Sequence, residues 1–232
     1  MKRIIRAAIA LAVMAALAAT GAAAAEGEWG GRMARLTYQG HGSFRIETAG
    51  GVVIYVDPYA GDGYDLPADI VLVTHQHGDH NRVDLPAKRE DCAVIANAEA
   101  LEGGTHNRFE LKGVAIEAVE AYNKNHDVKA CVGYLIEFDG LLIYAAGDTS
   151  TTARMAELAE RGIDYALLPC DGVYNMDLAE AAECARLIGA RFAIPIHLKP
   201  GALFDRARAE AFDAPNRLIV EAGEAIDLVP KP

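Results

Sequence analysis

The feature that most constrains the fold is a cluster of histidines that directly follows a buried strand. Residues 70–74 read Ile-Val-Leu-Val-Thr, a pattern typical of a strand covered on both faces. The run His75-Gln76-His77-Gly78-Asp79-His80 begins where this strand stops, so its side chains emerge at the edge of a sheet. Imidazole and carboxylate side chains this close together fit neither a core nor an ordinary solvated loop. They are the ligands of Zn²⁺ and neighbouring transition metals.

The spacing inside the run indicates two metal ions. Residues two apart in an extended segment point the same way, so His75 and His77 can share one ion. Gly78 permits a sharp turn, which can aim Asp79 and His80 at a second ion. These four side chains are too few for two ions, and further ligands must come from elsewhere in the chain.

Other candidate ligands lie near the ends of other predicted strands. His197 ends the strand at 192–196, and Asp148 follows a strand through Gly147, although an aspartate there can also be a plain helix cap. His126 lies in the polar loop 122–127, just before a strand. His106 lies in a glycine-rich loop with no strand before it and is expected to be a surface residue.

The order of the elements favours one α/β domain. Strands come first as meanders and then alternate with helices, and two facing mixed sheets with helices outside are the simplest way to cover them. With 232 residues and 52% hydrophobic content, the chain can bury one sizeable core. Strands are predicted at 35–39, 43–48, 52–56, 70–74, 94–96, 114–119, 133–138, 141–145, 165–168, 192–196, 218–220 and 226–228. Helices are predicted at 98–102, 151–161, 178–188 and 205–211.

The first 25 residues have the pattern of a secretory signal peptide. Lys2, Arg3 and Arg6 form a basic start, residues 7–18 are apolar, and Ala23-Ala24-Ala25 before Glu26 fits a cleavage site. We therefore expect a signal peptide at 1–25, a single domain at 26–232 and an exported, periplasmic or secreted protein. An uncleaved membrane anchor is the alternative.

The charge of the chain limits its partners. The formal net charge is −11, and removing the basic leader makes it more negative. Nucleic acid and anionic membranes are therefore poor partners, and a small-molecule substrate is expected, with no stable membrane association after cleavage. The four cysteines form no C-x-x-C pair and are expected to be buried small hydrophobic residues, although export would permit disulfides: Cys92, Cys131, Cys170 and Cys184.

Five segments together resemble the metallo-β-lactamase superfamily of metal-dependent hydrolases, and most closely its small branch of ascorbate-6-phosphate-lactonase-like proteins. The similarity covers about residues 35–229. It implies an αββα sandwich with two metal ions at the rim of the sheets. The segments are Gly40-His41-Gly42-Ser43-Phe44, Val56-Asp57-Pro58-Tyr59, Thr74-His75-Gln76-His77-Gly78-Asp79-His80, Ala146-Gly147-Asp148-Thr149 and Ile194-Pro195-Ile196-His197.

The resemblance also implies a ligand set. His126 is selected as the mid-chain ligand because the stretches around it, 121–123 and 132–134, resemble the pattern of this branch. His41 is expected to support the site without binding metal. Asp57 is expected to fix the histidine loop by hydrogen bonds, with a simple Asp-Pro turn as the alternative. The implied ligands are His75, His77 and His126 for the first ion, Asp79, His80 and His197 for the second, and Asp148 as the bridge.

The expected function is hydrolysis of a small ester, lactone or phosphoester by a hydroxide that two divalent ions activate. Zinc is the first choice of metal, with manganese or iron as alternatives. Asp79 can orient the nucleophile or take its proton. Tyr174 and Lys199 are candidate proton donors to the leaving group, or ordinary loop residues. Two other functions compete: an iron-dependent redox enzyme, and a non-catalytic metal-binding protein of the cell envelope.

Overall fold

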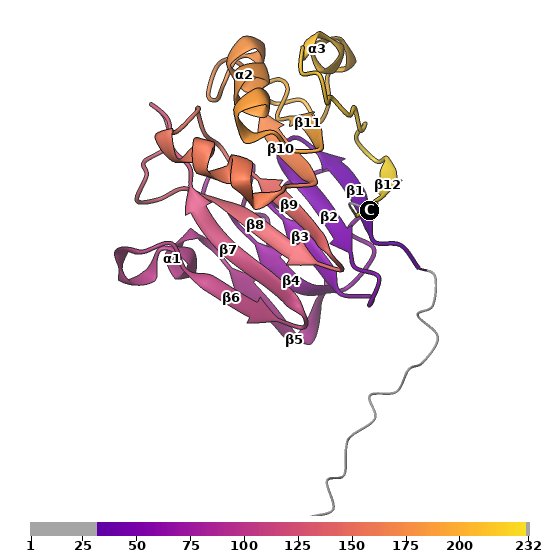
Figure 1. Ribbon diagram of the computed structural model, residues 1–232. Helices are drawn as coiled ribbons and strands as arrows, with labels where there is room; N and C mark the ends of the chain where they lie inside the picture. Colours follow the sequence, from indigo (N-terminus) through magenta and orange to yellow (C-terminus); the bar gives the residue numbers. More distant parts are fainter. Residues whose placement is uncertain (1–31, 231–232) are drawn as a thin grey trace, which may run out of the picture. The chain divides into compact units, whose positions relative to one another are not determined.

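The computed structural model describes residues 32–230, and the predicted signal peptide lies outside this part of the chain. In it, twelve strands form two six-stranded mixed sheets (Figure 1). The first sheet has the order β12-β1-β2-β3-β4-β5 and the second β11-β10-β9-β8-β7-β6. The bounds in the first sheet are β1 Arg35–Gly40, β2 Ser43–Glu47, β3 Val53–Val56, β4 Ala68–Leu72, β5 Lys88–Ile95 and β12 Ala225–Asp227. Those in the second are β6 Arg108–Leu111, β7 Val114–Glu120, β8 Val132–Phe138, β9 Leu141–Ala145, β10 Tyr165–Pro169 and β11 Phe192–Ile196.

The two sheets follow the same plan. Each begins with antiparallel hairpins, β1-β2-β3 in one and β6-β7-β8-β9 in the other. Each then adds parallel strands, β4 and β5 in one and β10 and β11 in the other. Parallel neighbours end at the same edge of a sheet, so this plan gathers several loops at one rim of the sandwich.

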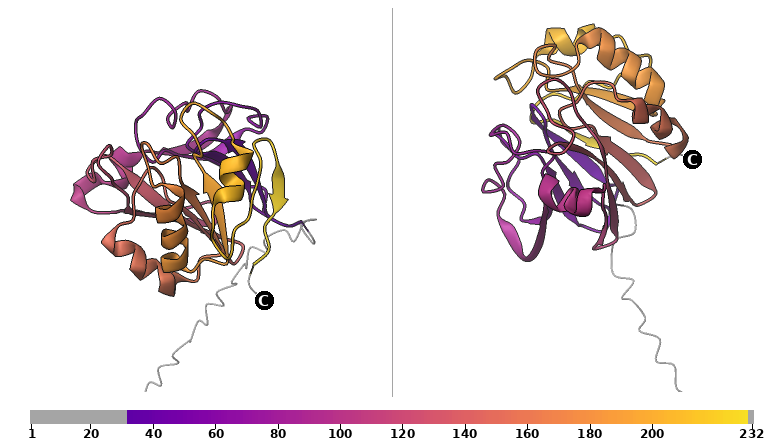
Figure 2. Two further views of the ribbon diagram at one scale, coloured as in Figure 1. Left: turned by 90° about the horizontal axis from the view of Figure 1, so that it is seen from above. Right: turned by 90° about the vertical axis from the view of Figure 1, so that its left-hand side faces the viewer.

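The main hydrophobic core lies between the sheets, which face each other in Figure 2. Ile54 and Ile70 of the first sheet and Ile143 and Ile194 of the second are fully buried members of this core. Burial of each such side chain stabilises the fold by about 1.5–3 kcal/mol. The apolar strands 53–56 and 68–72 are therefore rigid supports for the loops that follow them.

The helices cover the outer face of the second sheet. The 3₁₀ helix η2 (Ala153–Arg161), α2 (Leu178–Ile188) and α3 (Arg206–Ala211) lie over this face. The outer face of the first sheet packs against loop side chains such as Tyr64 and Leu66. The expected sandwich of two mixed sheets with outer helices is confirmed, with loops covering part of one face. A short helix, α1 (Asn97–Ala100), follows β5, and a 3₁₀ turn, η1 (Glu102–Gly104), follows α1.

Most predicted elements are confirmed, and three differ. β5 begins at Lys88, well before the predicted residue 94, and β6 was not predicted. The predicted strand at 218–220 is wrong: Leu218 donates one backbone hydrogen bond to Ala193, but the segment joins no ladder.

All four cysteines are free, and three of them are buried as expected. No helix among the described residues is both long and apolar enough to cross a membrane.

Candidate metal centre

The histidine run lies at the rim where β4 ends, and Asp57 holds it there. One carboxylate oxygen of Asp57 accepts the Thr74 amide at 2.7 Å, and the other accepts the Thr74 hydroxyl at 2.7 Å. The second oxygen also lies 2.8 Å from His80 Nδ1. Asp57 is buried and has a positive φ of 45°. It therefore joins the end of β3 to both ends of the run, which is the role expected for it.

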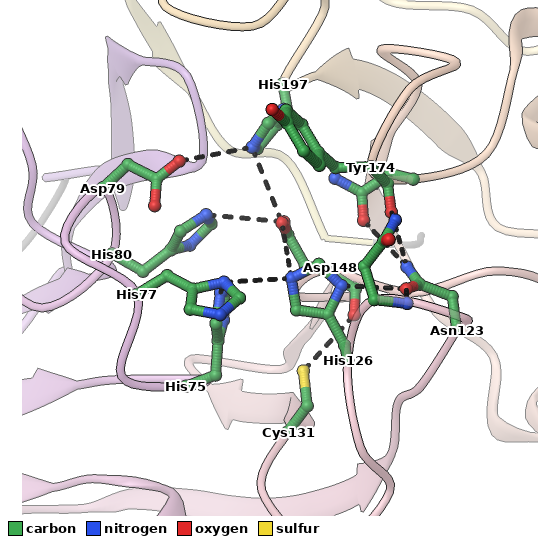
Figure 3. A network of polar contacts seen from close by, with 12 residues as sticks. His75, His77, Asp79, His80, Asn123, His126, Cys131, Asp148, Tyr174 and His197 are labelled. Carbon is green, nitrogen blue, oxygen red and sulfur yellow. Dashed lines mark hydrogen bonds and ion pairs between the residues drawn. The ribbon is translucent and has the colours of Figure 1, made fainter.

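The loop after β4 brings His75 and His77 together with His126. His77 Nδ1 lies 3.1 Å from His75 Nε2 and 3.2 Å from His126 Nε2 (Figure 3). A tetrahedral zinc ion with nitrogen ligands at about 2.0–2.1 Å separates those nitrogens by about 3.3 Å. The three rings form one group of candidate ligands. The distances fit a metal ion, and His126 lies beside the two histidines with which it is predicted to share one.

The second half of the run lies beside His197. Asp79 Oδ2 lies 3.9 Å from His197 Nε2 and 3.0 Å from His41 Nε2. The His41 ring packs on the His197 ring with a centroid distance of 3.6 Å. His41 also lies 3.3 Å from the Ala202 carbonyl through Nδ1. His41, Asp79, His80 and His197 form a second group whose ligand atoms lie within 4.8 Å of one another.

Asp148 lies between the two groups. Its Oδ1 lies 3.4 Å from His80 Nε2, and its Oδ2 lies 3.3 Å from His126 Nε2 and 3.6 Å from His197 Nε2. The side chain is buried. The structure thus brings all seven predicted ligands to one place, with Asp148 within reach of both sets, as Figure 3 shows.

Hydrogen bonds on the far side of two rings indicate which ring nitrogen carries a proton. His75 Nδ1 lies 3.0 Å from Thr74 Oγ1, whose own hydrogen is donated to Asp57. His80 Nδ1 faces the Asp57 carboxylate. In both rings Nδ1 is therefore the donor, and Nε2 of the neutral ring is a bare lone pair.

The same arrangement recurs in two other ligands. His126 Nδ1 lies 2.9 Å from the side-chain oxygen of Asn123. His197 Nδ1 lies 2.9 Å from Asp171 Oδ2. Both partners are acceptors, so Nε2 again carries the lone pair in the neutral ring. Such partners orient metal-binding histidines and raise their basicity.

Lone pairs therefore converge on a carboxylate. His80 Nε2 and His197 Nε2 are buried and have no hydrogen-bond partner. Together with His126 Nε2 they surround the Asp148 oxygens at 3.3–3.6 Å. Neutral imidazole lone pairs and an anionic oxygen repel one another unless a cation lies between them. These orphaned atoms fit bound metal ions.

The pKa shifts show the same need for positive charge. Burial by itself would lower the pKa of His80, but Asp148 and Asp57 outweigh it and raise the value to about 9. Burial raises the pKa of Asp148, but the imidazoles of His80 and His197 outweigh it and lower the value to about 2. Burial, together with the charge of His80, lowers the pKa of His75 to about 2. Without a metal, a proton on His80 supplies the balancing charge.

The other candidates lie outside these groups. His106 is half-buried and lines a cavity together with Met155 and Leu158 of η2. It joins no group of candidate ligands among residues 32–230. The Lys199 side chain is 61% exposed and lies 4.0 Å from Asp205. The backbone carbonyl of Tyr174 accepts hydrogen bonds from the side chains of Asn123 and Asn125, and in Figure 3 the Tyr174 ring extends toward His197.

Sequence reasoning missed Asp171 and Asn123 as the partners of His197 and His126. Asp171 had one visible signal, because it follows a predicted strand as Asp57 and Asp148 do.

Known proteins resemble this chain in sequence. A family model described as "Beta-lactamase superfamily domain" matches residues 35–197. A protein of Nitratidesulfovibrio vulgaris (strain DP4) named "UPF0173 metal-dependent hydrolase" is 34% identical over 193 residues, which cover 70% of this chain and 79% of that protein.

Solved structures share the fold. One from Parabacteroides distasonis is 30% identical, with a TM-score of 0.66, over 82% of this chain and 93% of that chain. Igni18, a metallo hydrolase of Ignicoccus hospitalis, is 24% identical, with a TM-score of 0.67, over 86% of this chain and 100% of its own. At that identity the second likeness shows the fold alone.

Proposed function

The chain belongs to the metallo-β-lactamase superfamily and is a metal-dependent hydrolase, and on this premise we propose that it hydrolyses a small ester, lactone or phosphoester at a centre of two divalent metal ions. The first ion is held by His75, His77 and His126. The second is held by Asp79, His80 and His197, and Asp148 is shared between them. Zinc is the proposed metal, because imidazole and carboxylate ligands suit it.

The observation that carries this proposal is the convergence of the Nε2 atoms on Asp148. Three of them lie within 3.3–3.6 Å of its two oxygens. The described residues hold three groups of candidate ligands, and the third joins Asp148 to His75 of one group and His80 of the other, which favours two ions that share this carboxylate.

The metal ions would polarise the substrate and lower the pKa of a water toward neutrality. Asp79 would position that water and take up its proton. Its side chain is 39% exposed, so a water can reach it. The hydrogen bond from His41 and the charge of His80 hold the pKa of Asp79 well below its usual range, although burial opposes them. Asp79 is therefore ionised at neutral pH and able to accept a hydrogen bond from that water, although so low a pKa makes it a weak base.

We also propose that residues 1–25 are removed and that the enzyme acts outside the cytoplasm. The support is the basic start, the apolar segment and the alanines before Glu26. N-terminal sequencing of protein recovered from the periplasm or the medium tests this: a first residue of Glu26 agrees, and a retained Met1 contradicts it.

The activity is tested with a substrate panel on metal-free protein that is reloaded with zinc, manganese or iron. The panel holds chromogenic esters, phosphodiesters, lactones and a β-lactam. We expect metal-dependent turnover of an ester, a lactone or a phosphoester, retained in His106→Ala and lost in Asp79→Ala. Two results contradict the proposal: a protein that binds two metals and turns over no substrate of the panel, which indicates a binding protein, and oxygen consumption with iron alone, which indicates redox chemistry.

A further inference from the structure

Exposed apolar side chains gather beside the metal centre. Eight large hydrophobic side chains of residues 32–230 are exposed, and half of them lie in two loops. One loop follows β7 and holds His126, and the other follows β10 and Asp171. The four residues, which we call the apolar lip, are Tyr122, Val128, Val173 and Tyr174. Scattered exposed apolar residues are ordinary, but a concentration of them at one rim marks a binding surface.

The backbone of Val173 and Tyr174 is held by residues that also hold the ligands. Asp171 faces His197 with Oδ2, and its Oδ1 accepts the amides of Val173 at 2.6 Å and Tyr174 at 2.7 Å. The turn that carries the two most exposed lip residues, 51% and 50% exposed, is thus tied to a ligand of the second metal.

Asn123 makes the matching connection to the first metal. Its side-chain oxygen accepts from His126 Nδ1 at 2.9 Å, and its side-chain nitrogen donates to the Tyr174 carbonyl at 2.9 Å. Asn125 Nδ2 donates to the same carbonyl at 2.9 Å. One amide side chain therefore fixes both a candidate ligand and the opposite loop, so the lip and the centre keep one relative position.

Exposed apolar side chains on a fixed backbone gain nothing in the free protein, whereas a ligand that covers them gains affinity from the preorganised surface. Binding sites for small molecules combine such apolar walls with a few polar groups that orient the reacting bond. The metal centre supplies those polar groups.

We propose that the apolar lip binds the non-reacting part of the substrate, so that the substrate is an ester, lactone or phosphoester carrying an alkyl chain or an aromatic ring next to the bond that is cleaved. This inference rests on the proposed function. Val173 and Tyr174 are the specificity-determining residues, and Asn123 is the positioning residue that keeps them in register with the metal centre.

The test measures binding, so that it does not depend on the identity of the substrate. Acetohydroxamate and octanohydroxamate share a metal-chelating head and differ in the length of the alkyl tail. Their dissociation constants are measured by calorimetry on the metal-replete protein, on Val173→Ser/Tyr174→Ser and on Leu187→Ser. Leu187 is an exposed apolar residue near the far end of α2 and serves as the matched control.

We expect octanohydroxamate to bind roughly tenfold more tightly than acetohydroxamate, the ratio that burial of about two methylene groups supplies. This ratio should fall below threefold in Val173→Ser/Tyr174→Ser and stay unchanged in Leu187→Ser, with the metal content of all three proteins equal. Equal affinity for both compounds in the native protein, or an unchanged ratio in the double variant, contradicts the role of the apolar lip in binding and leaves the proposed function intact. Failure of both compounds to bind the metal-replete protein contradicts the proposed function and the lip with it.

Discussion

At the scale of single residues, the centre depends on acceptors that face away from it. Four ligand histidines present Nδ1 to an oxygen of a partner residue, which leaves Nε2 free to face the centre, and three of these Nε2 atoms lie beside Asp148. Thr74, Asp57, Asn123 and Asp171 are these partners. They decide the tautomer and the orientation of the rings as directly as the ligands decide the chemistry.

His126 is the ligand that the sequence places least firmly, and it is tested by removal. His126→Ala should lose about one metal ion per chain, because its Nε2 completes the group with His75 and His77. His106→Ala should lose none, since His106 belongs to no such group among the described residues. Elemental analysis of the two purified variants makes the comparison, and the reverse pattern would show that His106 is the ligand.

Asp57→Asn tests the support of the histidine run. The amide cannot accept from both groups of Thr74 and from His80, so we expect stability to fall by about 2–4 kcal/mol and metal affinity to fall by about 10- to 100-fold. Urea denaturation and competition with a chelator measure the two effects. Asp84→Asn, at an exposed ion pair with Arg82, is the control and should change neither. Unchanged metal affinity in Asp57→Asn would show that Asp57 forms only a turn and does not support the metal ligands.

At the scale of elements, the strand ends set the position of the ligands, and Gly147 is the tightest point. It lies after β9, directly before Asp148, with φ of 63°. A Cβ there would meet the Val132 carbonyl oxygen at 2.6 Å and Thr74 Cβ at 3.0 Å. The backbone therefore passes where only glycine fits.

Gly147→Ala should cost about 2–4 kcal/mol, from the left-handed backbone and from the clash, and should lower metal affinity because Asp148 moves with it. Gly189→Ala has nearly the same φ of 64° but open space around the added Cβ, so it should cost only about 1 kcal/mol and leave metal binding intact. Equal effects of the two variants on metal affinity would show that Gly147 does not position Asp148.

The elements also show where sequence reasoning succeeds. The bounds of β9, α2 and β11 are all predicted correctly, because apolar patterns mark the strands and the Asp177 cap and Gly189 mark the ends of the helix. β5 begins with Lys88-Arg89-Glu90-Asp91, which as an exposed edge segment has no apolar pattern to detect. Leu218 and Val220 pack into the core without pairing in a ladder, so their apolar character misled the prediction.

The same reason decides which site residues can be recognised from the sequence. Ligands after apolar strands, such as His75, Asp148 and His197, are visible in the sequence because the strand marks their place. Asn123 and Asp171 are not, since their importance depends on a contact with a histidine that only the fold creates.

At the scale of the whole molecule, Asp69 ties the two sheets together at the end of the sandwich. Asp69, in β4, lies 2.8 Å from Lys112 Nζ, in the turn between β6 and β7, and also accepts the Val53 amide at 3.0 Å. Burial raises the pKa of Asp69, but the hydrogen bonds from Lys112 and Val53 outweigh it and lower the value.

Because the pKa of Asp69 is lowered in the folded state, ionised Asp69 stabilises the fold. This stabilisation is fully present above about pH 4, the ordinary pKa of aspartate, and is lost as the pH falls through the folded-state pKa. Asp69→Asn should therefore cost about 1 kcal/mol at pH 6, a modest figure because solvent screens Lys112. The difference from the native protein should shrink as the pH falls below 4. Urea titrations at several pH values measure it, with exposed Asp213→Asn as the control. A difference that stays constant down to pH 2 would contradict the assignment.

Metal stoichiometry and activity, measured in the same preparation, test whether two metal ions share Asp148. The purified native protein should hold two ions per chain by elemental mass spectrometry. Asp148→Ala should lose metal and activity together, while keeping the strand content of the fold by circular dichroism. A native protein saturated at one ion, or an Asp148→Ala protein that keeps two, would contradict the account.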